Sequence, residues 1–180
     1  MTALEERIRN VQFIVCDVDG VLTNGSIFFD AEGRSFRAVH ARDVTALTLW
    51  HLAGGKSALV SGLGSKAIEA IAATWRCTEC HLWIKDKARI CAEIALRHNI
   101  PPEAIAFLGD DIIDLCAMKH VGLAVAVQDA APEVKAVAHF ITDAPGGHGP
   151  LRELVHRILA AQGRLDETVK AYCDRKDGIQ

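Results

Sequence analysis

The chain has 180 residues, of which 50% are hydrophobic and 24% are charged, a composition typical of a globular protein rather than a disordered one. The formal net charge is −3, so no surplus of positive charge is available to bind the phosphates of a nucleic acid. No apolar stretch approaches the ~20 residues of a membrane span, and the charged N-terminus lacks an apolar signal core. We therefore expect a cytoplasmic protein without nucleic-acid or membrane partners.

Short apolar runs alternate along the chain with longer segments of helical periodicity. The runs that predict strands are residues 11–16, 57–60, 81–83, 105–108, 123–127 and 139–141. The segments that predict helices are residues 44–52, 66–75, 87–98, 112–118, 132–137 and 150–162. Strands separated by helices of this length pair in parallel through right-handed crossovers. The pattern therefore predicts an α/β fold with a doubly wound parallel sheet.

One segment breaks this alternation just after the first strand. Residues 26–30 and 35–40 have strand character and flank a turn signal at residues 31–34, which predicts a β-hairpin. No internal repeat and no low-complexity linker is visible, so we expect a single domain over residues 1–173 and a mobile tail at residues 174–180. The sheet, its helices and the hairpin account for the chain, which leaves no stretch for a cap domain over the sheet.

Polar side chains follow three of the predicted strands. The first strand is followed by DVDGVLT (residues 17–23), the second core strand by Ser61, and the strand at 105–108 by GDDIID (residues 109–114). Ligands of open α/β sheets bind at the carboxyl ends of the strands. Carboxylates brought together there repel one another unless a hard cation such as Mg²⁺ lies between them. The sequence therefore predicts a magnesium site at this edge of the sheet.

The same residues suit the transfer of a phosphoryl group. A carboxylate beside the metal can attack phosphorus, and a second carboxylate two residues on can serve as acid and then as base. Ser61 is placed to bond the phosphoryl group, and a lysine after the strand at 81–83, Lys85 or Lys87, to balance its charge.

These motifs carry a family resemblance. The four that resemble the haloacid dehalogenase superfamily of phosphatases are residues 17–23, Ser61, Lys87 and residues 109–114. Those similar to its capless branch are residues 19–25, 42–43, 121–127 and 146–153. That branch includes the 3-deoxy-D-manno-octulosonate 8-phosphate phosphatases and their nonulosonate 9-phosphate relatives. The similarity covers about residues 8–170.

The resemblance implies a role for each matching residue. Asp17 is expected to be the nucleophile and a Mg²⁺ ligand, Asp19 the acid and base that binds the metal through its carbonyl, and Asp110 the third protein ligand. Ser61 and Lys87 complete the catalytic set, whereas Asp111 and Asp114 are expected to support their loop.

The resemblance also implies substrate contacts and an assembly. The residues expected to bind substrate are Arg42, Asp43, Gly62 and Lys66. A homotetramer is expected, in which the hairpin helps to form the ring and a neighbouring subunit closes the active site in place of a cap. The loop at residues 146–149 is expected near the shared interface.

The match is weaker on the substrate side. Relatives that act on the octulosonate have arginines where this chain has Thr48, Leu63 and Ile71, none of which can bind a carboxylate or phosphate through two parallel bonds. The substrate is therefore left open among sugar-acid phosphates. An alternative is a catalytically weak or inactive assembly module, related to the phosphatase-like domain of some sialic-acid activating enzymes.

A second motif needs another interpretation. Residues 77–81 match the C-x-x-C-H pattern of haem attachment, and Cys77 with Cys80 resembles half of a zinc site. Haem attachment requires export, and the remaining Cys and His residues lack a second paired motif. We expect a turn that leads into a strand, and the role of the two cysteines is left open.

Overall fold

The computed structural model describes residues 2–175, so most of the predicted tail, from residue 176 onward, lies outside the described residues. The strands are β1 (Phe13–Cys16), β2 (Phe28–Phe29), β3 (Ser35–Phe36), β4 (Lys56–Val60), β5 (Glu79–His81), β6 (Ile105–Gly109), β7 (Leu123–Ala126) and β8 (Phe140–Ile141). The α-helices are α1 (Ala3–Asn10), α2 (Ala41–Leu52), α3 (Lys66–Thr74), α4 (Lys87–His98), α5 (Leu115–Met118), α6 (Pro132–Val137), α7 (Pro150–Ala161) and α8 (Leu165–Cys173). Two 3₁₀ turns are η1 (Pro102–Ala104) and η2 (Ile112–Asp114).

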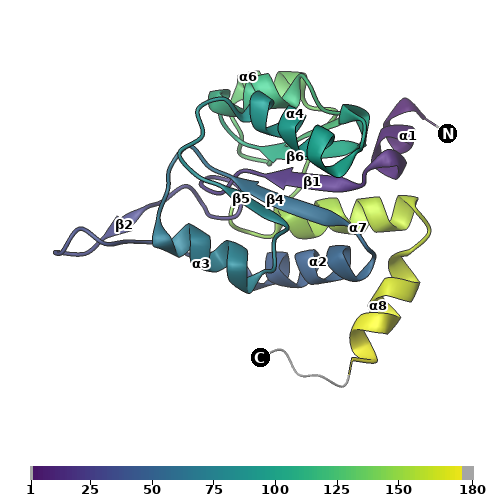
Figure 1. The fold of residues 1–180 in the computed structure, drawn as a ribbon, viewed down its shortest axis with the longest axis horizontal. Helices are drawn as coiled ribbons and strands as arrows, with labels where there is room; N and C mark the ends of the chain where they lie inside the picture. The colour runs from purple at the N-terminus through teal and green to yellow at the C-terminus, as the bar shows by residue number, and fades with distance from the viewer. Residues whose placement is uncertain (1, 176–180) are drawn as a thin grey trace.

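Six strands form one parallel sheet in the order β5-β4-β1-β6-β7-β8, which confirms the predicted doubly wound α/β fold. Helices α4 and α6 cover one face, and α2, α3 and α7 cover the other (Figure 1). Every residue of β1 and β6 is buried, as expected for central strands with helices on both sides. The carboxyl ends of these two strands carry the loops that form the candidate site.

Helix α4 follows its predicted bounds. Asp86 caps the amino end by accepting a hydrogen bond from the Arg89 amide at 3.0 Å. The buried residues Ile90 and Ile94 repeat at helical spacing along the face that packs on the sheet. Lys87 stands one turn before Ile90 on that face and is fully buried, so the helix directs a lysine into the protein interior.

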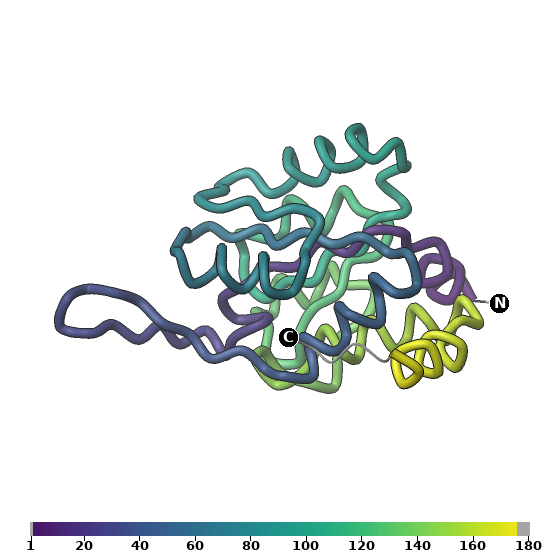
Figure 2. Tube along the Cα trace, turned by 60° about the horizontal axis from the view of Figure 1, so that its bottom comes forward, coloured from purple at the N-terminus to yellow at the C-terminus, as the bar shows by residue number. Residues whose placement is uncertain are grey.

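The hairpin is present but shorter than predicted. β2 and β3 pair through two residues each, instead of along residues 26–30 and 35–40, because no second layer covers them. The rings of Phe28 and Phe36 stack with their centroids 5.4 Å apart. The hairpin projects from the body, at the end opposite to α1 and α8 (Figure 2).

One other strand differs from expectation. β5 comprises Glu79–His81 rather than residues 81–83, because Trp83 has a φ of +62° that interrupts an extended backbone. The chain after Gly163 continues as α8 as far as Cys173. No helix among residues 2–175 is long and apolar enough to cross a membrane.

Candidate active site

The site lies where the strand order reverses. The chain leaves β1 toward β4 and leaves β6 toward β7, in opposite directions, and the carboxyl ends of β1 and β6 lie side by side. The Asp17 amide donates to the Leu108 carbonyl at 3.0 Å, which continues the pairing by one residue beyond β1. Asp17 and Asp110 therefore follow two adjacent strands, as the sequence predicted.

A cluster of carboxylates lies at these strand ends. Ligand oxygens of Asp17, Asp110 and Asp114 lie within 4.8 Å of one another. The Lys87 ammonium lies 2.9 Å from Asp17 Oδ1 and 2.6 Å from Asp114 Oδ1. Of the two lysines considered, Lys85 is exposed and Lys87 is buried in the cluster. Two of the three acids thus bond the same buried cation.

Burial and mutual repulsion change how these groups ionise. Burial raises the pKa of Asp17 to about 6, with Asp114 acting in the same direction. Burial also raises the pKa of Asp110 to about 8, assisted by the charges of Asp17 and Asp114. Burial on its own lowers the pKa of Lys87, but the two neighbouring carboxylates outweigh it, so the pKa of Lys87 lies above its usual value. Lys87 is therefore a permanent cation in the site.

Asp114 is committed to its own loop. Its Oδ1 accepts from Lys87, and its Oδ2 accepts the amides of Asp110 at 3.0 Å and Asp111 at 3.4 Å. Asp111 is exposed, and its carboxylate accepts the Ile112 amide at 2.7 Å. Both side chains thus make the kind of loop contacts that the sequence suggested for them.

The loop after β1 is held closely against Asp110. Gly20 has a φ of +93°, and a Cβ there would lie 2.0 Å from Asp110 Oδ2, so only glycine fits. The Thr23 hydroxyl accepts the amides of Gly20 and Gly25, at 3.2 and 3.1 Å. Gly147 donates to the Val21 carbonyl at 2.8 Å, so the loop at residues 146–149 supports the loop after β1 from behind.

The remaining predicted residues differ in their exposure to solvent. Ser61 is buried at the end of β4, and its hydroxyl accepts the Leu63 amide at 3.1 Å. Gly62 follows it and is partly exposed, whereas Lys66 begins α3 and Arg42 lies in the first turn of α2, both exposed to solvent. The side chains of Lys66 and Arg42 are therefore accessible to solvent, whereas that of Ser61 is not.

Asp43 has a different environment. It is fully buried, and its Oδ1 accepts the Arg152 amide at 2.9 Å in the first turn of α7. Burial raises the pKa of Asp43 to about 7. Substrate binding by Asp43 stays a prediction, and the geometry favours a structural bond between α2 and the amino end of α7.

Sequence reasoning missed Arg37, which follows β3. Its Nε lies 2.6 Å from Asp19 Oδ1 and its Nη2 lies 3.2 Å from Asp19 Oδ2. No motif includes this arginine, and the only signal for it was a basic residue inside the predicted hairpin.

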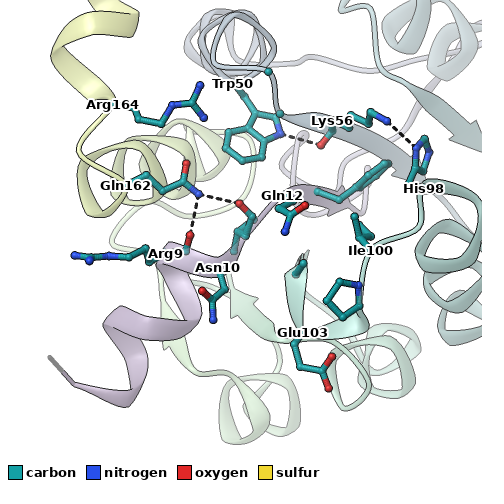
Figure 3. A pocket seen from close by; sticks show the side chains of 16 residues that line it. Arg9, Asn10, Gln12, Trp50, Lys56, His98, Ile100, Glu103, Gln162 and Arg164 are labelled. Atoms are coloured by element: carbon teal, nitrogen blue, oxygen red, sulfur yellow. Dashed lines mark hydrogen bonds between the residues drawn. The ribbon is translucent and has the colours of Figure 1, made fainter.

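A hollow of about 750 Å³ lies elsewhere, at the amino ends of β1 and β4 (Figure 3). Trp50 donates to the Lys56 carbonyl at 2.8 Å within it, and Lys56 contacts His98 at 3.1 Å. Its lining contains none of Asp17, Asp19, Lys87 or Asp110. The hollow is therefore separate from the carboxylate cluster.

Comparison with known proteins agrees with this geometry. Residues 84–149 match the family model of haloacid dehalogenase-like hydrolases. The 3-deoxy-D-manno-octulosonate 8-phosphate phosphatase of Yersinia pestis is 34% identical over 89% of this chain and 86% of its own length. The chain belongs to the haloacid dehalogenase-like hydrolases.

Solved structures support the same assignment. The crystal structure of the Yersinia pestis phosphatase has a TM-score of 0.89 at 34% identity and covers 91% of this chain and 89% of its own. The phosphatase of Moraxella catarrhalis, in complex with a magnesium ion, a phosphate ion and KDO, has a TM-score of 0.92 at 26% identity, with 96% and 99% covered. The chain is thus a phosphatase, and no separate cap domain is present in residues 2–175.

The acids of this hydrolase fit the magnesium ion of the family. Asp110 Oδ1 is buried and has no hydrogen-bond partner within the described chain, and it lies in the cluster with Asp17. Carboxylate oxygens are the ligands that Mg²⁺ selects, and an added divalent charge relieves the repulsion among the three acids. Asp17 and Asp110 would hold the ion, and Asp19 Oδ1 and Oδ2 are turned to Arg37 instead.

We expect the stabilisation of this hydrolase by Mg²⁺ to increase with pH. Folding raises the pKa of Asp17 from 3.8 to about 6 and that of Asp110 from 3.8 to about 8. The two protonated carboxyls therefore stabilise the metal-free fold fully below a pH of 3.8, and this stabilisation is lost as the pH rises through about 6 and about 8. Mg²⁺ must displace these protons, so its apparent affinity should rise about tenfold per pH unit for each proton released. Melting temperatures with Mg²⁺ and with a chelator, between about pH 5 and about pH 8, measure this. A difference that does not change with pH would contradict it, and Asp110→Asn should abolish the difference.

We expect Gly20→Ala to weaken Mg²⁺ binding about tenfold or more, because the new methyl group must displace the Asp110 carboxylate. Gly25→Ala is the matched control: its φ is +79°, but the nearest atom lies 3.8 Å away, so the variant has the backbone strain without the clash. Calorimetric titration of both variants with Mg²⁺ compares them. Equal affinities would show that the contact between Gly20 and Asp110 does not set metal binding.

Proposed function

We propose that this hydrolase is a Mg²⁺-dependent phosphomonoesterase that acts on a small sugar phosphate through an aspartyl-phosphate intermediate. The observation that carries the proposal is the arrangement of Asp17, Lys87 and Asp114 at the switch point of the sheet. Mg²⁺, when bound, supplies positive charge that offsets the charge on the phosphoryl oxygens and allows the neighbouring acids to be ionised together.

The first half of the proposed reaction transfers the phosphoryl group to the protein. An oxygen of Asp17 attacks phosphorus, a bond between that oxygen and phosphorus forms, and the bond between phosphorus and the sugar oxygen breaks. Asp19 gives its proton to the departing sugar oxygen. Lys87, within 2.9 Å of Asp17, holds the attacking carboxylate in place and balances the added charge.

The second half restores the carboxylate. Asp19, now ionised, takes a proton from water, whose oxygen attacks phosphorus while the bond to Asp17 breaks and inorganic phosphate leaves. Ser61 is buried at the adjacent strand end, where its hydroxyl is available to bond the phosphoryl oxygens. A complete set of these side chains does not favour the alternative of an inactive assembly module.

The substrate is proposed to be a sugar-acid phosphate, such as 3-deoxy-D-manno-octulosonate 8-phosphate or a nonulosonate 9-phosphate. Relatives named as phosphatases of the octulosonate 8-phosphate support this class. The three positions that depart from the family pattern carry no cation: Leu63 is 45% exposed, Ile71 packs against the core, and the Thr48 hydroxyl donates to the Val44 carbonyl. The exposed cations Lys66 and Arg42 remain for the anionic groups of a substrate.

We further propose a homotetramer in which a neighbouring subunit covers the site. The hairpin exposes three large rings, with Phe28, Phe29 and Phe36 at 50%, 68% and 55%. Trp83 is 69% exposed beyond β5, whose carboxyl end lies at the same edge of the sheet. Large exposed apolar patches mark protein interfaces, and phosphoryl transfer requires protection from bulk water.

Replacement of the nucleophile should remove the activity. We expect Asp17→Asn to lower phosphate release at saturating Mg²⁺ by about 10³-fold or more, because the amide cannot attack phosphorus. Asp166→Asn, which changes an exposed acid on α8, is the control and should keep wild-type turnover. The assay is phosphate release from an aryl phosphate and from sugar phosphates of about six to nine carbons.

Two results would contradict the assignment. Wild-type turnover in Asp17→Asn would exclude Asp17 as the nucleophile. A folded wild-type protein that binds Mg²⁺ but releases no phosphate from any ester would overturn the enzymatic proposal.

Removing rings from the hairpin should break the assembly. We expect Phe29→Asp to reduce the mass measured by light scattering and, with it, turnover, because a charge replaces a ring at the interface. Leu96→Asp is the matched control, since Leu96 is 83% exposed on α4 and lies outside the hairpin. A wild-type monomer with full activity would exclude the tetramer.

A further inference from the structure

We propose that Arg37 is a positioning residue that holds the Asp19 carboxylate in its reactive orientation, which makes the hairpin part of the catalytic machinery. The inference rests on the role of Asp19 in the proposed function and adds a residue outside the four motifs.

The two side chains meet through a pair of nearly parallel bonds. Arg37 Nε donates to Asp19 Oδ1 at 2.6 Å, and Nη2 donates to Oδ2 at 3.2 Å. This fork fixes the plane of a carboxylate as well as its position, which a lysine cannot do. Among residues 2–175 the Asp19 carboxylate has no other hydrogen-bond partner, so its orientation depends on Arg37.

The guanidinium is itself held from two further sides. Its Nη1 donates to Ser35 Oγ in β3 and to Ser65 Oγ, each at 3.2 Å. Ser65 is the N-cap of α3, where its side chain accepts the Ile68 amide. The hairpin, α3 and the loop after β1 therefore converge on one side chain.

Burial separates this pair from an ordinary surface ion pair. The Arg37 side chain is 3% exposed and that of Asp19 is 16% exposed. Exposed pairs contribute little because solvent screens them and both partners stay mobile. Arg34, in the same hairpin, illustrates the contrast, since its side chain is 75% exposed and pairs with Asp30 and Glu32 at the tip.

The position of Arg37 in the chain links Asp19 to the exposed surface of the hairpin. Arg37 directly follows Phe36, one of the exposed rings of the hairpin. A neighbouring subunit that packs on the hairpin therefore also orders Arg37 and, through it, Asp19. An acid misplaced by about 1 Å can lose about 10²-fold in rate, so this order matters for turnover.

The test is a double-mutant cycle with Arg37→Gln and Asp19→Asn, measured on the full-length protein with Mg²⁺. We expect Arg37→Gln to lower kcat on a sugar phosphate about tenfold to a hundredfold with little change in KM, and Arg37→Lys to recover part of the loss. In the Asp19→Asn background, Arg37→Gln should cause no further loss beyond about twofold, because its effect passes through Asp19. Arg34→Gln is the matched control, which removes the same group from the same hairpin and should keep wild-type kcat.

A second readout separates positioning from folding. The kcat/KM of Arg37→Gln should fall more for a sugar phosphate than for nitrophenyl phosphate, whose leaving group needs no proton. Equal losses on both esters, a loss confined to KM, or additive losses in the Asp19→Asn background would each overturn the proposal. A wild-type protein without turnover on any ester would instead contradict the proposed function, so the two failures are distinguishable.

Discussion

The repulsion among three adjacent carboxylates, two of them buried and the third partly buried, is the constraint on which the rest of this structure depends. Oxygens of Asp17, Asp110 and Asp114 lie within 4.8 Å of one another, and only one ammonium, that of Lys87, bonds the cluster in the described chain. At an effective dielectric constant of about 20, each ionised pair at such a distance costs about 3 kcal/mol. One cation cannot offset three acids, so the cluster retains either protons or a divalent ion. The raised pKa values of Asp17 and Asp110 reflect this repulsion, and a bound divalent cation such as Mg²⁺ relieves it.

The fold supplies the means of holding those charges together. Adjacent parallel strands place Asp17 and Asp110 at one edge, and the buried face of α4 brings Lys87 beneath them. Asp114 then uses both oxygens, one on Lys87 and one on the amides of its own loop, so the loop that carries Asp110 is tied to the cation. Each of these charged side chains would lower the stability of the fold if it were buried alone, because burying an unpaired ammonium or carboxylate costs free energy. The arrangement is stable only as a set, which explains why the separate pieces occur together in the sequence.

Some parts of this site could be predicted from the sequence, and others could not. The strand ends that carry Asp17, Ser61 and Asp110 follow from apolar runs in a parallel sheet, and the bounds of α4 follow from its cap and periodicity. The predicted bounds of β5 were wrong because Leu82 and Trp83 have the apolar character of strand residues. In the structure the Trp83 side chain lies against Gly64, where a Cβ would be 2.2 Å from the indole nitrogen. Arg37 was missed for a deeper reason. Its partner is fixed by where the chain after β3 returns to the loop after β1, and no local pattern encodes that approach.

The hairpin is also the least supported element at the site, which makes its link to Asp19 consequential. Its strands pair through two residues each, and one stacked pair of rings joins them, so few interactions within the hairpin fix its position. The bonds from Arg37 to Asp19 and Ser65 therefore carry much of the attachment between hairpin and body. Energetic coupling of this kind is reciprocal. In the proposed tetramer, a neighbouring subunit that stabilises the hairpin favours one orientation of Asp19. A substrate that engages Asp19 in that orientation favours the assembled hairpin by the same free energy. In the proposed tetramer, subunit contact and the orientation of Asp19 are then coupled through one equilibrium.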